Sequence, residues 1–176
     1  QAFDSSEVFT NALAAKENMR TESFAQKLCV SSQGNVDCIK NAQLEEGQKG
    51  LLFSLSNHKV LYANGIYDKV YPASITKIMT AMLALQSGKL NDTVTITQDN
   101  VTLEDGSQVC GFVAGDQVTL DQLLHCLLVY SGNDAASAIA EYVGGSTENF
   151  VQMMNDYAAK LGCTGTHFSN PHGLQD

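Results

Sequence analysis

The chain has 176 residues, of which 44% are hydrophobic and 16% are charged, and this is typical of one globular domain with a buried core. Nineteen Asp and Glu against ten Lys and Arg give a formal net charge of −9, which argues against a nucleic-acid partner and against polybasic binding to anionic lipid. No apolar run approaches the roughly 20 residues of a membrane helix, and residues 1–28 lack the apolar core of a signal peptide. The composition predicts a soluble domain.

Residues 1–47 are predicted to form an N-terminal helical extension, because apolar residues recur at loosely helical spacing between positions 4 and 28. Of the five cysteines, Cys29 and Cys38 bracket a polar stretch and could close a disulfide loop in an oxidising compartment. The alternative is a set of unpaired, mostly buried thiols. No CxxC pair occurs, so the cysteine spacing does not resemble a zinc site.

Short strands are predicted in the next part of the chain. Residues 51–55 and 60–63 read as two strands around a short turn, and residues 94–97 alternate like a half-buried strand. Residues 104–118 carry three glycines among polar residues and indicate turns. Because strands come first and helices follow, the order indicates an α+β fold.

Three helices are predicted after the strands. Thr119 can cap a helix that runs to Tyr130 with leucines on one face, and an Ala-rich helix over Asp134–Val143 is stopped by Gly144 and Gly145. Thr147 can cap the last helix. One face of that helix holds Phe150, Met154, Tyr157, Ala158 and Leu161.

The stretch Val70–Gly88 is the most informative, because Lys77 is its only charged residue. A helix without a charged face is usually buried on most sides. Its apolar stripe is predicted to consist of Ile75, Ile78, Met79, Met82 and Leu83, with Lys77 on the opposite side beside Ala81 and Ala84.

Ser74 lies three residues before Lys77, so the two side chains can meet on one helix face. Burial lowers the pKa of a lysine, and a neutral Lys77 could take the hydroxyl proton and make Ser74 a nucleophile. The alternative is that Lys77 extends to water while Ser74 only caps the helix.

A second group, Ser131-Gly132-Asn133-Asp134, joins two predicted helices. Asn133 offers an acceptor and two donors for a substrate amide, and Ser131 can relay a proton. The alternative is ordinary turn and cap chemistry, because these residue types are common there.

The pair SxxK and SxN is typical of penicillin-binding proteins and class A β-lactamases. The stretches Tyr71–Ala81, Ser131–Ala136 and His167–Leu174, the last containing NPHGL, resemble the low-molecular-weight penicillin-binding proteins that act as serine-type D-alanyl-D-alanine carboxypeptidases. The resemblance covers residues 48–176, which we therefore expect to be the N-terminal part of a transpeptidase-like domain.

This resemblance implies a β-lactamase/transpeptidase-like fold, in which an antiparallel sheet packs against a helical subdomain. It implies that Ser74 is the acylated nucleophile, Lys77 its base, Ser131 a proton relay and Asn133 a substrate-binding residue. The Ser74 backbone N–H would supply half of an oxyanion hole. The implied substrate is a peptidoglycan stem peptide ending in D-Ala-D-Ala, with β-lactams as covalent inhibitors and no metal or cofactor. His172, in NPHGL, is interpreted as structural.

The sequence departs from the family pattern, because it contains no KTG segment. In the family a strand carrying KTG belongs to the sheet and the site, so we expect C-terminal sheet strands to be missing from this chain. The predicted partners therefore include the chain's own C-terminal segment or a second copy. The leading prediction is a bacterial, extracytoplasmic peptidoglycan carboxypeptidase that influences cell shape. The alternatives are a serine β-lactamase and a non-catalytic penicillin-recognising module.

Overall fold

The computed structural model describes residues 36–37, 44–54 and 59–174. Contacts divide the chain into two compact units, residues 1–68 and 69–176, and each unit is described by itself. Most of the predicted N-terminal extension, Cys29 and Cys38 included, lies outside the described residues. The division at residue 47 and the Cys29–Cys38 bridge therefore stay predictions.

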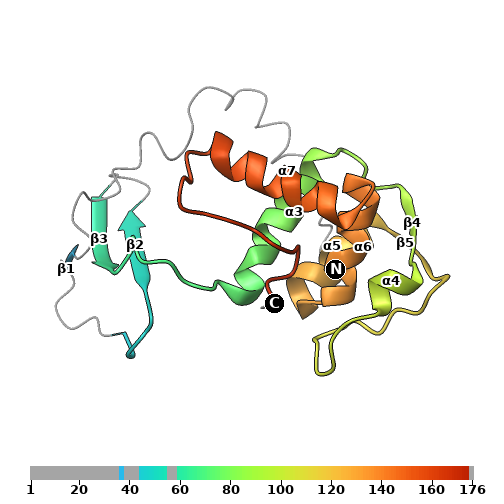
Figure 1. Ribbon diagram of the computed structural model, residues 1–176, viewed down its shortest axis with the longest axis horizontal. Coiled ribbons are helices and arrows are strands. Elements are labelled where there is room, and N and C mark those ends of the chain that lie inside the picture. Colours follow the sequence, from blue (N-terminus) through green and yellow to red (C-terminus); the bar gives the residue numbers. More distant parts are fainter. Residues whose placement is uncertain (1–35, 38–43, 55–58, 175–176) are drawn as a thin grey trace, which may run out of the picture. The chain divides into compact units, whose positions relative to one another are not determined.

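The first unit contains a small antiparallel sheet. Its strands are β1 (Val36–Asp37), β2 (Gly50–Ser54) and β3 (Lys59–Asn64), and β3 lies between β1 and β2 (Figure 1). Leu51 pairs with Ala63, and the register shifts between Leu52 and Phe53. The two predicted strands are thus confirmed as neighbours, while the turn predicted between them lies outside the described residues.

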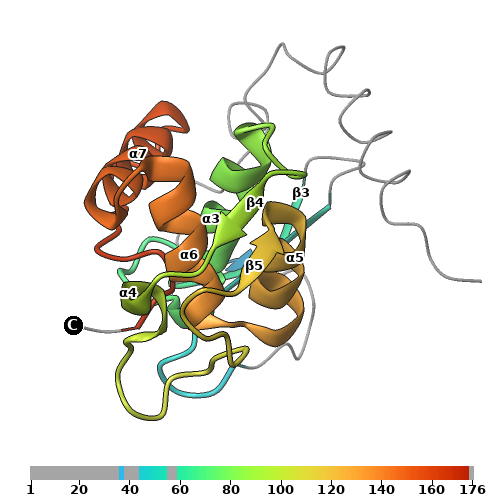
Figure 2. The same cartoon turned by 90° about the vertical axis from the view of Figure 1, so that its right-hand side faces the viewer.

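The second unit is mostly helical, with a two-stranded antiparallel sheet at its edge. The strands are β4 (Thr93–Thr95) and β5 (Gln117–Thr119), which run side by side in Figure 2. The helical elements are η1 (Ala73–Thr76), α3 (Lys77–Gln86), α4 (Gln98–Val101), α5 (Leu120–His125), η2 (Cys126–Tyr130), α6 (Asn133–Gly144) and α7 (Thr147–Lys160). Small antiparallel sheets with a helical subdomain match the predicted α+β class.

Helix α6 organises the core of this second unit, since it contacts α3, α4, α5 and α7. Its alanines allow these helices to approach closely. The buried apolar cluster consists of Ala81, Leu83, Ala84, Val94, Ile96, Leu120, Leu123, Leu124, Leu127, Ala135, Ala136, Ala138, Ile139, Ala140, Phe150 and Met154. Every helix in the described part of the chain is too short or too polar to cross a lipid bilayer.

The helix caps confirm one prediction and correct another. The Thr119 side chain accepts a hydrogen bond from the Gln122 N–H and forms a capping box. Helix α7, however, is capped by Ser146, whose side chain accepts a bond from the Asn149 N–H, and Thr147 is the first helical residue. Ser and Thr are both good caps, so the sequence alone could not choose between the two adjacent hydroxyls.

The predicted burial of the helix around Lys77 on most of its sides is wrong in part. Ile75 and Ile78 are 66% and 56% exposed, whereas Ala81 and Ala84 on the Lys77 side are buried. The alanine face packs against the core because small side chains let α3 approach α6 closely. His125 lies exposed at the end of α5.

Candidate active site

Ser74 lies in η1, the 3-10 turn that precedes α3. Pro72 occupies the N-cap position of this turn, where the missing N–H of proline is not needed. Ala73 has a φ of +49°, a left-handed conformation that is uncommon for a residue with a Cβ. The turn ends as α3 begins, so that Ser74 is exposed at the surface and Lys77 is the first residue of α3.

The side chains of Ser74, Lys77 and Ser131 form a closed hydrogen-bonded group. Lys77 Nζ donates to Ser74 Oγ and to Ser131 Oγ, each at 3.1 Å. Ser131 Oγ in turn donates to Ser74 Oγ at 3.1 Å. The structure therefore brings together three of the four residues predicted for the site, from segments 54 or more positions apart in the chain.

Lys77 is the buried member of this group, with 3% of its surface exposed. Desolvation by burial lowers the pKa of its amine from the usual value, because the ammonium loses its hydration. Within the described part of the chain, no carboxylate forms an ion pair with it. A deprotonated amine 3.1 Å from Ser74 Oγ can accept the hydroxyl proton, which is the arrangement that activates a serine nucleophile.

Ser131 reaches this position because the helix before it is irregular. The predicted helix over residues 119–130 is α-helical only as far as His125, and residues 126–130 form the π-helical segment η2. Ser131 then adopts a left-handed conformation with a φ of +63°, and the chain enters α6 two residues later. Non-glycine residues with positive φ and π-helical turns both occur frequently at functional sites.

Asn133 is the fourth predicted residue, and it is 3% exposed. Its backbone N–H donates to the Gln108 carbonyl at 2.7 Å, which fixes the start of α6. Its side-chain oxygen Oδ1 is buried and has no hydrogen-bond partner among the described residues. Because buried polar atoms are nearly always paired, this oxygen is suited to accept a hydrogen bond from a ligand N–H.

Asp134 is a residue whose importance the sequence reasoning missed. Its Oδ1 accepts bonds from the backbone N–H groups of Cys110 and Ala135, both at 2.9 Å, and its Oδ2 accepts bonds from those of Gly111 and Phe112, at 3.0 and 3.4 Å. This buried carboxylate fastens the loop before β5 to the Ser131–Asn133 turn. The signal in the sequence was present but weak, because an Asp in the first turn of a helix is ordinary cap chemistry.

Cys110 packs at the same turn. A Cβ added to Gly132 would overlap the Cys110 thiol. Burial, followed by the charge of Asp134, raises the pKa of Cys110 to about 12. The thiol therefore stays protonated at neutral pH and fills space beside Gly132.

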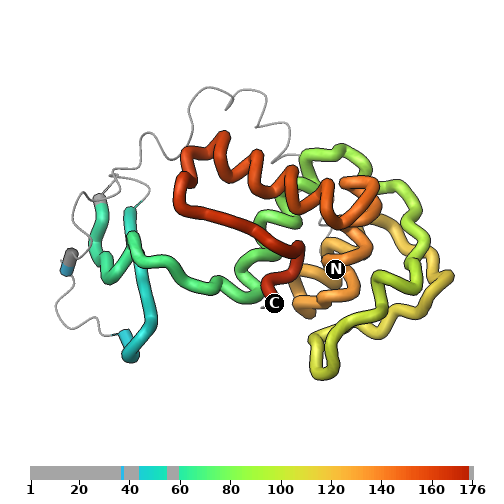
Figure 3. The backbone as a smooth tube through the Cα atoms, in the orientation of Figure 1, coloured from blue at the N-terminus to red at the C-terminus, as the bar shows by residue number. Residues whose placement is uncertain are grey.

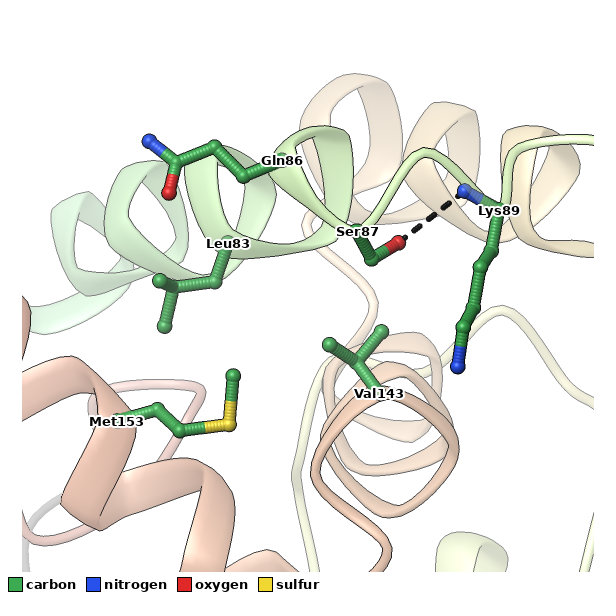
Figure 4. A pocket seen from close by; sticks show the side chains of 6 residues that line it. All are labelled: Leu83, Gln86, Ser87, Lys89, Val143 and Met153. Carbon is green, nitrogen blue, oxygen red and sulfur yellow. Dashed lines mark hydrogen bonds between the residues drawn. The ribbon is translucent and has the colours of Figure 1, made fainter.

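A separate hollow of about 380 Å³ lies at the other end of α3 (Figure 4). It is lined by Leu83, Gln86, Ser87, Lys89, Val143 and Met153. Lys89 is the one charged residue in that lining, and its ammonium lies 5.5 Å from the centroid of the Tyr142 ring. No predicted site residue lines this hollow.

Among the described residues, no group of three or more His, Cys, Asp or Glu could hold a metal ion.

The sequence of residues 35–176 matches the model of the Peptidase S11 family, D-alanyl-D-alanine carboxypeptidase. The chain belongs to this family. It is 42% identical over 134 residues to D-alanyl-D-alanine carboxypeptidase DacC of Escherichia coli, covering 70% of this chain and 33% of the relative. The chain thus spans about a third of the length of the curated relatives it matches.

Solved structures agree with this assignment. The carboxypeptidase DacD from Francisella tularensis superposes with a TM-score of 0.69 at 30% identity, covering 82% of this chain and 36% of that one. Penicillin binding protein 5 from Haemophilus influenzae gives a TM-score of 0.62 at 37% identity, covering 68% and 36%. The family and the fold class predicted from the two motifs are confirmed.

Proposed function

We propose that the protein is a penicillin-sensitive D-alanyl-D-alanine carboxypeptidase that works through an acyl-serine intermediate. The observation that carries this proposal is the contact of the buried Lys77 amine with the hydroxyls of both Ser74 and Ser131. A lysine in this setting does not stabilise the fold, because its charge is buried and no carboxylate among the described residues pairs with it. It is explained if its function is to exchange protons with the two hydroxyls.

The first half of the reaction forms the acyl-enzyme. Lys77 Nζ accepts the proton of Ser74 Oγ, and Ser74 Oγ attacks the carbonyl carbon of the penultimate D-alanine. The Ser74 backbone N–H stabilises the oxyanion. The C–N bond then breaks, and the terminal D-alanine leaves with a proton that passes from Lys77 through Ser131.

In the second half a water molecule attacks the acyl carbon, its proton returns through Lys77 and Ser131 to Ser74 Oγ, and the shortened peptide leaves. Asn133 Oδ1, buried and without a partner among the described residues, accepts the hydrogen bond of a substrate amide and orients the peptide. A β-lactam follows the first half of the same path and stays attached to Ser74.

This function places the protein outside the cytoplasmic membrane of a bacterium, where peptidoglycan lies, and implies a role in cell shape. The substrate is a stem peptide ending in D-Ala-D-Ala. We also propose that the chain interacts with a C-terminal segment of the same protein or with a second copy.

The test is intact-mass analysis of the full-length protein after exposure to benzylpenicillin. We expect one benzylpenicilloyl group on the wild type and on Ser87→Ala, a control at the other end of α3, and none on Ser74→Ala. Release of D-alanine from a peptide ending in D-Ala-D-Ala should follow the same pattern. An adduct on Ser74→Ala would place the nucleophile elsewhere, rapid loss of the adduct would indicate a β-lactamase, and no adduct at all would indicate the non-catalytic module.

A further inference from the structure

The segment after α7 returns to the part of the chain where α3 begins (Figure 3). There Gly173 lies against Ala73 of η1, the turn that precedes α3. A Cβ added to Gly173 would overlap the Ala73 carbonyl oxygen and would stand 2.5 Å from the carbonyl carbon and 2.8 Å from Thr76 Oγ1. Two of these three atoms belong to backbone and cannot rotate away. Gly173 also has a φ of +87°, so its position requires glycine for two independent reasons.

The turn that presents Gly173 is held by Asn170. Its Oδ1 accepts hydrogen bonds from the backbone N–H groups of Gly173 at 2.6 Å and of His172 at 3.3 Å. Its Nδ2 donates to the Leu174 carbonyl at 2.7 Å. A single side chain thus ties together both ends of the Asn170–Leu174 turn, which gives the turn a fixed shape.

The same turn is anchored to α3. Thr80 Oγ1, fully buried, donates to the Pro171 carbonyl at 2.6 Å. Thr80 lies one helical turn after Lys77 in α3, so the Asn170–Leu174 turn and the Lys77 amine are both attached to the same helix. Helix α3 therefore fixes the distance between Gly173 and η1.

Contact with the Ala73 carbonyl has a consequence for Ser74. The Ala73 C=O and the Ser74 N–H belong to one peptide unit, and no peptide bond among the described residues is cis. In a trans peptide the two groups point in opposite directions. Gly173 on the carbonyl side therefore determines the direction of the Ser74 N–H on the other side, and amides in the first turn of a helix are free to bind a ligand.

We propose that Gly173 is a positioning residue that holds the Ala73–Ser74 peptide plane so that the Ser74 N–H meets the developing oxyanion. This inference rests on the proposed acyl-serine function. The strained φ of Ala73 supports it, because such a conformation persists only where the surroundings fix it. The NPHGL segment, of which only His172 was interpreted from sequence and as structural, thereby acts on the chemistry through the backbone of η1.

The test compares Gly173→Ala with Gly162→Ala in the full-length protein. Gly162 has a φ of +79°, and no atom of the described residues lies within 4 Å of an added Cβ, so the control introduces the same backbone strain without the contact. The measurements are the limiting rate constant of Ser74 acylation by benzylpenicillin, the dissociation constant of the preceding non-covalent complex, and the thermal midpoint. A boronic acid that mimics the tetrahedral intermediate provides a further probe.

Loss of one oxyanion donor slows related chemistry by about 10²–10³, and a displaced donor should cost a part of that. We expect Gly173→Ala to acylate about 10- to 100-fold more slowly, with boronate affinity falling in parallel and the non-covalent dissociation constant changing less than about threefold. Gly162→Ala should match the wild type in all kinetic measurements. Asn170→Ala, which loosens the turn without adding an atom, should show a weaker version of the Gly173→Ala effect.

Equal rates in Gly173→Ala and Gly162→Ala would overturn the inference and leave the proposed function intact. Loss of non-covalent binding with an unchanged limiting rate would also overturn it, because the residue would then act on substrate binding. If Gly173→Ala does not fold, the limiting acylation rate constant and the non-covalent dissociation constant of Asn170→Ala decide between the two outcomes. A wild type that is not acylated would overturn the proposed function, and this assignment with it.

Discussion

Replacing Lys77 by methionine should stabilise the protein while abolishing acylation. Methionine has nearly the length of lysine but no charge, and Lys77 is 3% exposed without an ion-pair partner in the described part of the chain. The Ser131–Ser74 hydrogen bond remains, so no buried hydroxyl loses its last partner. Replacing a buried ion by an apolar residue of similar volume is often stabilising by about 1–4 kcal/mol. We expect the free energy of unfolding at pH 7 to rise by about 1–3 kcal/mol.

The pH dependence of this difference has a definite sign. The pKa of Lys77 is lowered in the folded protein, so between its folded and its unfolded value the unfolded chain binds more protons, and wild-type stability rises with pH. The penalty for burying the ammonium is fully present below the folded pKa and vanishes above the unfolded value, about 10.4. The advantage of Lys77→Met should therefore shrink as the pH rises toward 10.

Urea unfolding of wild type, Lys77→Met and the exposed control Lys160→Met at pH 7 and pH 9.5 measures these differences. Lys77→Arg should be acylated about as poorly as Lys77→Met, because arginine keeps its proton and cannot act as a base. If Lys77→Met is less stable than the wild type, burial of the Lys77 amine does not destabilise the folded protein, and the reasoning is refuted. Rapid acylation of Lys77→Arg would refute its assignment as the base.

Three further predictions concern the surroundings of the site. At pH 8 iodoacetamide should modify the exposed Cys163 about a hundredfold faster than Cys110, whose pKa is raised to about 12 by burial. Peptide mapping measures the two rates, and faster modification of Cys110 would contradict this prediction. Asp134→Asn should lower the free energy of unfolding by about 2 kcal/mol, since an NH₂ group would face two backbone donors; urea unfolding within 0.5 kcal/mol of wild type, on the order of measurement error, would contradict this. Thr80→Val should cost about 1–3 kcal/mol, because the Pro171 carbonyl loses its buried donor, and an unchanged thermal midpoint would show that the bond is dispensable.

The sequence predicted the local part of the site well. Ser74 and Lys77 are three positions apart, and the geometry of one helical turn is enough to bring such side chains together. The absence of any other charge between Val70 and Gly88 correctly indicated that Lys77 is buried. The short strands and the limits of α6 followed from alternation and from paired glycines.

The contact of Ser131 with both residues could not be derived from local rules. It joins positions 54 and 57 apart, and only the resemblance to a family suggested it. The π-helical segment was also invisible, because the leucine spacing over residues 119–130 fits a regular α-helix. The exposed Ile75 and Ile78 show a similar limit: periodicity identifies an apolar face, but tertiary packing decides which face is buried.

The segment η2 has a consequence for how this part of the chain can change. A π-helical turn holds one residue more than the α-helical turn it replaces, and each residue of a regular helix rotates the chain by about 100°. Deleting one residue between Cys126 and Tyr130 would restore a regular helix and rotate Ser131 away from Lys77. Leu128, Val129 and Tyr130 are each more than half exposed, so their identities can vary. The number of residues in this segment cannot vary, because it sets the reach of the Ser131 hydroxyl.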